Sequence, residues 1–254
     1  MNTDNMSILG LTIDYGPYGW LEDYDPDWTP NTTDAEGRRY RFRNQPDIAL
    51  WNLVQLGNAL YPLIEDIASM EQVLNSYSQQ FDSQFPILQQ QKLGLQAEYD
   101  APFQDELTTL LTASETDMTI FYRNLSNVEK TDTSDEALAK ITLAFYQPDK
   151  IVTTLQTSWL NWMELYLEKI KAEVGSDEER KQAMNTINPK YVLRNYMAQL
   201  AIEAAEKEDY TLIDELYTLL KNPYDEQPQY EKWFAKRPDW ARHKVGCSML
   251  SCSS

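Results

Sequence analysis

Cysteine and histidine are scarce in this sequence, and their scarcity excludes several kinds of site. The 254 residues include two cysteines, Cys247 and Cys252, and one histidine, His243. Two cysteines close to one end do not make a disulfide framework, and low cysteine usage is typical of a reducing compartment. A single histidine in a basic segment lacks the companion ligands of a zinc site and the partners of a catalytic triad.

Glycine, basic residues and long apolar runs are also in short supply. Eight glycines among many Leu, Ala, Gln and Glu residues favour helices over sheets. No stretch approaches the roughly 20 apolar residues of a membrane span, and the N-terminus lacks the features of a signal peptide. With 22 basic and 40 acidic residues, the net charge of −18 repels nucleic-acid phosphates and anionic membranes. We therefore expect a cytoplasmic protein that binds neither nucleic acid nor membrane.

The order of elements along the chain predicts one domain in two parts. Residues 7–13 form a short apolar run broken by Gly10, which predicts a small β-hairpin. Residues 14–45 show no periodicity, and a loop of this length in a compact domain is usually functional. The rest of the chain, from Pro46, has helical spacing. We expect residues 1–45 to form a catalytic hairpin and loop, and residues 46–254 a helical body with a cysteine-containing tail.

Several helices are predicted within the helical body. After the helix that begins near Pro46, they lie roughly at 64–80, 103–113, 116–128, 134–146, 150–174, 189–209 and 210–221. In 150–174, an apolar stripe that includes Trp159, Trp162 and Tyr166 predicts a core-facing helix. Ser176 and Glu179 have the spacing of a capping box for the next helix. The glutamines around Pro86 are interpreted as a solvated connection.

The residue types that suit magnesium-dependent chemistry gather in the first fourteen residues. Asp4 and Asn5 place a carboxylate beside an amide oxygen, and Asp14 offers a second carboxylate. Hard cations prefer such oxygen ligands, and phosphoryl-type transfer uses a carboxylate to accept the proton of the attacking hydroxyl. Asp14-Tyr15-Gly16 also resembles the Asp-Phe-Gly signature of kinases. The alternative is that these are ordinary turn residues.

Four segments carry a more specific resemblance. They are Asn2-Thr3-Asp4-Asn5-Met6-Ser7-Ile8-Leu9-Gly10-Leu11-Thr12-Ile13-Asp14-Tyr15-Gly16-Pro17, then Asn44-Gln45-Pro46 with Ala49-Leu50-Trp51-Asn52-Leu53, then Asn188-Pro189-Lys190-Tyr191-Val192-Leu193-Arg194-Asn195, and the tail Ser251-Cys252-Ser253-Ser254. Together they resemble the selenoprotein O family, called YdiU in bacteria.

This resemblance implies a pseudokinase that transfers AMP from ATP to Ser, Thr or Tyr hydroxyls of protein substrates. By motif match, Asp4 is the proton acceptor, Asn5 and Asp14 hold Mg²⁺ (or Mn²⁺), and Asp14 also approaches the phosphates of ATP. The implied fold is mostly α: the helical C-terminal lobe of a protein-kinase-like fold, with the short β-hairpin at its N-terminus.

The match covers only the C-terminal half of the family. The Gly-rich segment, the phosphate-contacting Lys with its Glu partner, and the phosphate-binding Arg residues belong to the other half, so we expect no AMP transfer by this chain alone. Two alternatives remain open: a kinase-like phosphotransferase that uses the same metal ligands, and a non-catalytic helical interaction module.

Two further features leave alternatives open. Arg38, Arg39, Arg41 and Arg43 form a basic cluster that either contacts a substrate or, as we favour, pairs with nearby acids. Cys252 aligns with the family's tail selenocysteine position, and Pro30 stands where many members have a cysteine. A redox-sensitive Cys247–Cys252 loop is therefore one possibility, and two free thiols are the favoured one.

Overall fold

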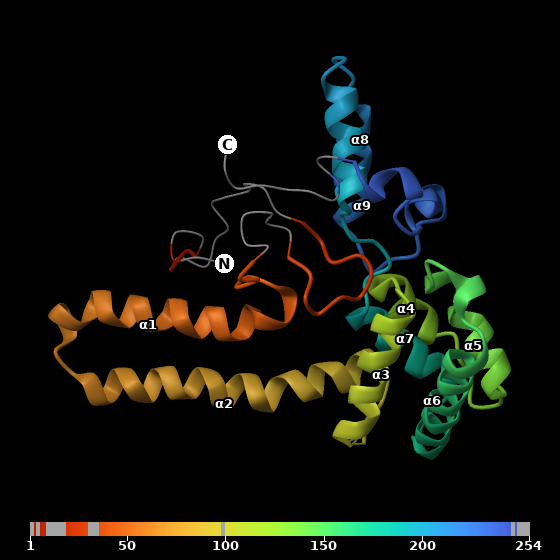
Figure 1. Ribbon diagram of the computed structural model, residues 1–254, viewed down its shortest axis with the longest axis horizontal. Helices are drawn as coiled ribbons and strands as arrows, with labels where there is room; N and C mark the ends of the chain where they lie inside the picture. The colour runs from red at the N-terminus through yellow and green to blue at the C-terminus, as the bar shows by residue number, and fades with distance from the viewer. Residues whose placement is uncertain are drawn as a thin grey trace.

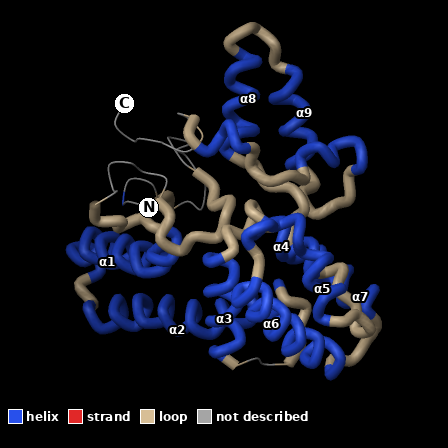
Figure 2. The backbone as a smooth tube through the Cα atoms, turned by 45° about the vertical axis from the view of Figure 1, so that its right-hand side comes forward, coloured by secondary structure: helices blue, strands red, loops and turns tan. Residues whose placement is uncertain are grey.

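The chain is seen in a computed structural model that describes residues 3, 6–8, 19–29, 36–97, 100–244 and 247. The described part is mostly helical and has three regions: a long two-helix arm, a central helical body and a second helical hairpin (Figures 1 and 2). No helix among the described residues is both long and apolar enough to cross a membrane.

The arm consists of α1 (Gln45–Ile64) and α2 (Ile67–Lys92), which lie side by side and extend away from the body (Figure 1). Pro46 lies in the first turn of α1, where its missing N–H is tolerated. The helix ends at Glu65 in a left-handed conformation, and Asp66 caps α2 by accepting a hydrogen bond from Ser69 N (3.1 Å).

The predicted solvated connection around Pro86 is wrong, because α2 continues through Pro86 to Lys92. A proline inside a helix removes one backbone hydrogen bond, but packing can outweigh that loss. Here the Phe81 and Phe85 rings stack with centroids 5.2 Å apart just before the proline. Beyond it, Leu93 is fully buried in the body and fixes the end of the helix.

The central body contains five helices that surround an aromatic core. They are α3 (Ala101–Ala113), α4 (Met118–Leu125), α5 (Ser134–Ile141), α6 (Thr153–Ala172) and α7 (Asp177–Ile187). Trp159, Trp162 and Tyr166 of α6 are fully buried, which confirms the predicted core-facing stripe. The Trp162 ring stacks on Tyr166 at 5.3 Å and on Phe103 of α3 at 4.9 Å. The polar atoms of this stripe are satisfied, as when Tyr166 OH donates to Leu93 O (2.8 Å).

The capping box predicted at the start of α7 is confirmed. Ser176 Oγ accepts from Glu179 N at 3.2 Å, and Glu179 Oε2 accepts from Ser176 N at 2.8 Å. This reciprocal pair satisfies two backbone donors that a helix start otherwise leaves free. The start of α7 is therefore fixed by its own sequence, shortly after α6 ends.

The second hairpin is formed by α8 (Asn195–Ala205) and α9 (Thr211–Leu220), which stand above the body in Figure 2. They share a smaller core with the segment that follows α9, in which Tyr196, Leu216 and Trp233 are buried. Short 3₁₀ helices complete the described chain: Phe42–Asn44, Thr142–Ala144, Pro148–Lys150, Pro228–Trp233 and Asp239–Arg242.

The predicted N-terminal β-hairpin is wrong. Across the residues that the structure describes there is no strand or sheet, and Ser7 and Ile8, where the hairpin was predicted to begin, are coil and turn. The only extended pairings in this part of the chain are two isolated bridges, Asp23 with Asp117 and Thr116 with Phe145. A short apolar run forms a strand only if a neighbouring strand pairs with it, and the described part of the chain offers no such strand.

Candidate functional site

The predicted metal and catalytic residues, Asp4, Asn5 and Asp14, lie outside the residues that the structure describes. Their convergence on one divalent cation therefore stays a prediction. What the structure does describe is how the flanking residues on both sides are held. Those contacts concern Met6 and residues 20–24, which flank the predicted site in the sequence.

On the N-terminal side, Met6 directly follows Asn5 and lies against α1. Asn52 of α1 is buried, and its Nδ2 donates to Met6 Sδ at 2.9 Å. The Asn52 side chain is thus shielded from water while its Oδ1 atom has no protein hydrogen-bond partner. Burying an amide oxygen without a hydrogen-bond partner costs free energy, so the packing around Asn52 must offset that cost.

On the C-terminal side, the segment from Trp20 to Tyr24 is held between the start of α4 and the start of α8. Tyr24 N donates to Thr116 O (2.8 Å), and Met118 N donates to Glu22 O (3.2 Å). Trp20 N donates to Asn195 Oδ1 at 3.4 Å. The backbone a few residues after Asp14 is therefore bound at several points to the body of the protein.

A buried ion pair lies at the centre of this region. Arg194 binds Asp117 with both guanidinium nitrogens, at 2.5 Å to Oδ2 and 2.9 Å to Oδ1, and the two side chains are 3% and 0% exposed. Asp117 Oδ1 also accepts from Ile120 N (3.0 Å) and so caps α4. Burial alone would lower the pKa of Arg194, but the charge and hydrogen bonds of Asp117 raise this pKa above its usual value.

Glu22 is a second buried carboxylate next to this pair. Burial raises the pKa of Glu22 from 4.5 to about 7, and the charges of Arg237 and Arg194 oppose that rise. Arg237 Nη1 lies 3.2 Å from Glu22 Oε2, and its Nη2 donates to Asp23 Oδ1 at 3.1 Å. Neither Glu22 oxygen makes a geometrically sound hydrogen bond. Glu22 is therefore held by charge and packing, and the cost of burying its negative charge is what raises its pKa.

Tyr146 and Glu115 extend the network toward the C-terminal segment. Tyr146 OH donates to Asp117 Oδ2 (3.3 Å) and accepts from Arg237 N (3.1 Å). Burial, followed by the charge of Asp117, raises the pKa of Tyr146 well above its ordinary value, so this hydroxyl stays protonated. Arg242 pairs with Glu115 beside it. The network thus joins five segments of the chain, at residues 22–23, 115–117, 146, 194 and 237–242.

This cluster serves as an anchor and is not a metal site. Four acids, Glu22, Asp23, Glu115 and Asp117, each lie within ion-pair distance of one of three arginines, Arg194, Arg237 and Arg242. Within the described ranges, no group of three or more His, Cys, Asp or Glu side chains is arranged to hold a metal ion. The cluster instead fixes residues 22–24, because Glu22 and Asp23 pair with Arg237 and the neighbouring backbone binds residues 116–118.

Sequence reasoning missed this network, although part of its signal was visible. Arg194 and Asn195 stand in the segment 188–195 that carried the resemblance, and both make contacts to residues 20–24 or to their anchor. Lys190 of the same segment binds Glu226 and Glu231, each at 2.7 Å. Glu22, in contrast, gives no signal in the sequence, because nothing there distinguishes it from other acids near the loop.

We expected the basic cluster at 38–43 to pair with nearby acids, and two of its four arginines do so. Arg41 Nε and Arg43 Nη2 lie 3.3 and 2.8 Å from Asp27 Oδ1. The Arg39 guanidinium lies 4.4 Å from the centre of the Trp51 ring, a cation–π distance. These contacts tie the end of the loop to α1.

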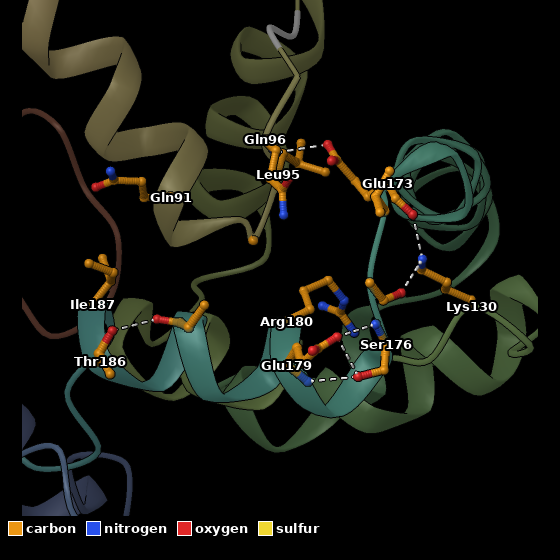
Figure 3. Close-up of a pocket in the computed structure, with 14 residues that line it drawn as sticks. Gln91, Leu95, Gln96, Lys130, Glu173, Ser176, Glu179, Arg180, Thr186 and Ile187 are labelled. Atoms are coloured by element: carbon orange, nitrogen blue, oxygen red, sulfur yellow. Dashed lines mark hydrogen bonds between the residues drawn. The ribbon is translucent and has the colours of Figure 1, made fainter.

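A cavity of about 540 Å³ lies away from this region, between the end of α2, the end of α6 and α7 (Figure 3). Lys130 Nζ donates to Glu173 O (2.6 Å) and Gly175 O (2.9 Å), and Glu173 Oε1 accepts from Gln96 N (2.8 Å). Lys130 and Gln96 thus bind the turn between α6 and α7 from neighbouring segments. Since the polar groups of the cavity are used in this way, we assign the cavity to the packing of that turn and not to catalysis.

Of the two tail cysteines, the structure describes only Cys247. Cys247 is buried in the second core, and burial raises its thiol pKa. Cys252 lies outside the described residues. The choice between a Cys247–Cys252 loop and two free thiols therefore stays a prediction.

Comparison with known proteins identifies the family. The family described as "Protein adenylyltransferase SelO" matches residues 1–221. A protein nucleotidyltransferase YdiU of Flavobacterium johnsoniae is 60% identical over the whole chain, and those of Rhodopirellula baltica and Aromatoleum aromaticum are 51% and 49% identical. Each alignment covers 100% of this chain and 48–49% of the relative. The chain thus spans about half the length of the curated relatives it matches, and it belongs to the SelO family of protein adenylyltransferases.

Proposed function

We propose that this chain carries the metal-binding and proton-accepting part of an enzyme that transfers AMP from ATP to Ser, Thr or Tyr hydroxyls of proteins. The observation that supports this most is the family match over residues 1–221, since it includes the segment with Asp4, Asn5 and Asp14. The names of the relatives, protein nucleotidyltransferases, indicate the same reaction class.

In this proposal Asp4 accepts the proton of the substrate hydroxyl. The hydroxyl oxygen then bonds to the α-phosphorus of ATP, the bond to the bridging oxygen breaks, and pyrophosphate leaves. A general base of this kind contributes about 10²–10⁴ in rate. Asp4 must therefore sit within hydrogen-bond reach of the hydroxyl when the protein substrate is bound.

Asn5 and Asp14 are proposed to hold Mg²⁺ or Mn²⁺, with Asp14 also near the phosphates. An amide oxygen and a carboxylate fit this role, because hard divalent cations take oxygen ligands. When bound, such a cation neutralises charge on the phosphates of ATP. Contacts of flanking residues support the proposal. Met6, the neighbour of Asn5, lies against α1, and the segment Trp20–Tyr24, which begins six residues after Asp14, is bound to the body.

The reaction is tested by mass spectrometry of a model protein substrate. This chain is joined to the half that its Flavobacterium johnsoniae relative has in addition, and is supplied with ATP and Mg²⁺. We expect a mass increase of one AMP, and a loss of at least about 100-fold in Asp4→Asn and Asp14→Asn. Asp239→Asn is a matched control, because that carboxylate is fully exposed and remote from residues 1–14 in sequence.

The alternatives give different results in the same assay. A mass increase of one phosphate identifies the kinase-like phosphotransferase. No modification at all, together with no ATP binding by calorimetry, identifies the non-catalytic interaction module. Activity of the 254-residue chain alone contradicts the expectation that the second half is required.

We also propose that the protein acts in the cytoplasm. The support is compositional: two cysteines in 254 residues are typical of a protein kept in a reducing compartment. Fractionation of cells that express the chain, followed by immunoblotting, tests this directly.

A further inference from the structure

Asn52 of α1 is a buried polar residue that packing alone does not explain. The helix lies wholly within the described range 36–97, and only two of its 20 residues, Ile48 and Asn52, are buried. They lie one turn apart on the same face of the helix, and Asn52 is 4% exposed. An apolar side chain fits a buried position without penalty, whereas a buried amide atom without a hydrogen-bond partner costs free energy. The reason for an amide at this position therefore lies in what it binds.

The amide of Asn52 binds a residue next to the candidate metal ligands. Among the described residues its hydrogen-bond partner is Met6, whose Sδ accepts from Asn52 Nδ2 at 2.9 Å across 46 positions of the chain. Sulfur is a weak acceptor, so this contact contributes little to the stability of the fold. What the contact does provide is location, because it joins α1 to the direct neighbour of Asn5.

The Asn52 side chain also has an acceptor that is left open. Its Oδ1 is shielded from water and has no hydrogen-bond partner among the residues that the structure describes. Both polar atoms belong to one amide group, so the open acceptor lies beside the contact with Met6. An amide presents two N–H donors and one acceptor oxygen, and here this capacity is used only in part. A polar group that lowers stability in this way is typical of residues that serve a functional site.

The helical turn that carries Asn52 is fixed by contacts to neighbouring segments. Tyr77 OH of α2 donates to Pro46 O in the first turn of α1, at 3.1 Å. The Arg39 guanidinium lies 4.4 Å from the centre of the ring of Trp51, the residue before Asn52. Side chains on a fixed helix position what they bind more precisely than side chains on loops. Asn52 is therefore a defined point of attachment for the chain near Asn5.

We infer that Asn52 is a positioning residue for the candidate metal site: by holding Met6, it sets where Asn5 can meet the cation. This inference rests on the proposed function, because it takes Asn5 as a metal ligand. Consecutive Cα atoms lie about 3.8 Å apart, so a fixed Met6 confines the backbone of Asn5 to its immediate surroundings. Groups that orient a metal ligand from outside the coordination sphere contribute about 10–100-fold in metal affinity.

The test is Mn²⁺ binding, measured from the electron paramagnetic resonance signal of the free ion. The protein is this chain joined to the half that its Flavobacterium johnsoniae relative has in addition, with an ATP analogue that cannot be cleaved between the α- and β-phosphates. We expect Asn52→Leu to raise the dissociation constant for Mn²⁺ at least about tenfold. The same change should leave the unfolding midpoint unchanged or higher, because it removes a buried and partly unsatisfied amide. A purely structural role predicts instead that affinity falls only where stability falls.

Two further variants isolate the contact. Met6→Leu removes the sulfur acceptor; since Met6 is 38% exposed, this variant should fold normally and still weaken Mn²⁺ binding. If Asn52 acts through Met6, the double variant should bind Mn²⁺ no more weakly than Asn52→Leu alone, because one contact can be lost only once. Asn58→Leu is the matched control, because it makes the same substitution at an exposed position of the same helix and should bind Mn²⁺ like the wild type.

Asp14→Asn separates this inference from the proposed function. If the wild-type protein does not bind Mn²⁺, or if Asp14→Asn binds it equally well, the proposed metal site fails and the inference fails with it. If Asp14→Asn abolishes binding while Asn52→Leu and Met6→Leu bind like Asn58→Leu, the metal site stands and only the positioning role is refuted. If Asn52→Leu unfolds and Met6→Leu binds normally, Asn52 is a structural residue and the inference is refuted as well.

Discussion

Replacing Arg194 by methionine should destabilise this protein far more than the loss of an ordinary surface charge. Arg194 binds both oxygens of Asp117, and the two side chains are 3% and 0% exposed. Methionine keeps the length and apolar character of the side chain but removes its charge. Asp117 is then a carboxylate in a water-excluded site without its cation, and breaking a buried pair in this way costs about 3–5 kcal/mol.

The assay is chemical and thermal unfolding followed by circular dichroism. For a chain of this size each kcal/mol lowers the melting temperature by about 2–4 °C, so the midpoint should fall by about 6–20 °C. Arg43→Met is the control. Arg43 pairs with Asp27 at 2.8 Å, but these side chains are 57% and 39% exposed, and an exposed pair contributes at most about 1 kcal/mol.

A double-mutant cycle isolates the pair itself. Asp117→Asn combined with Arg194→Met removes both charges, while the amide oxygen can still cap α4. The double variant should therefore be less destabilised than the sum of the single variants by at least about 1 kcal/mol. If Arg194→Met costs no more than Arg43→Met, or if the two changes simply add, the pair does not anchor this region and the reasoning is refuted.

Three further perturbations test other parts of the structure. Glu22→Gln should gain stability relative to wild type as pH rises. The folded-state pKa of Glu22, about 7, lies above the ordinary 4.5, so the stability that its protonated form contributes is present at low pH and is lost as pH rises from 4.5 through 7. Urea unfolding of both proteins at several pH values measures this. Trp162→Ala should cost about 3–5 kcal/mol in the same measurement, because this fully buried ring stacks on Phe103 and Tyr166. Gly94→Ala should cost more than about 1 kcal/mol, because Gly94 has φ of +68° and a Cβ there would lie 2.6 Å from Met184 Sδ; an unchanged unfolding midpoint would contradict this.

Helix positions were predictable wherever local signals dominate. The stripe of Trp159, Trp162 and Tyr166 and the Ser176–Glu179 capping box are both present as predicted, because periodicity and capping act within a few residues of the chain. Predicted helix boundaries were wrong where backbone N–H groups donate to distant parts of the chain instead of to their own helix. The helix predicted at 189–209 begins only at Asn195, since Lys190 N and Tyr191 N donate to Pro223 O instead of joining the helix.

The surroundings of the candidate site were less predictable than the helices. The acids and the amide of the first fourteen residues suggested a cation site through their chemistry alone, and their arrangement stays a prediction. The anchor beyond them depends on Glu22, Asp117, Arg194 and Arg237, which are separated by as many as 215 positions in the chain. No local pattern indicates which arginine will meet which acid, because that choice is made by packing between distant segments.

The sequence by itself determined the helical character of the chain, its aromatic core helix, its acidic surface and, through the segments at 2–17 and 188–195, its resemblance to one enzyme family. Only the tertiary structure decided that Glu22 is buried among arginines, that α2 passes through Pro86, and that Asn52 is buried beside Met6. The physical reason is the distance along the chain over which each interaction acts. Propensity, periodicity and capping depend on neighbours within a few residues, whereas burial and ion pairing depend on which distant segments exclude water from the same small volume.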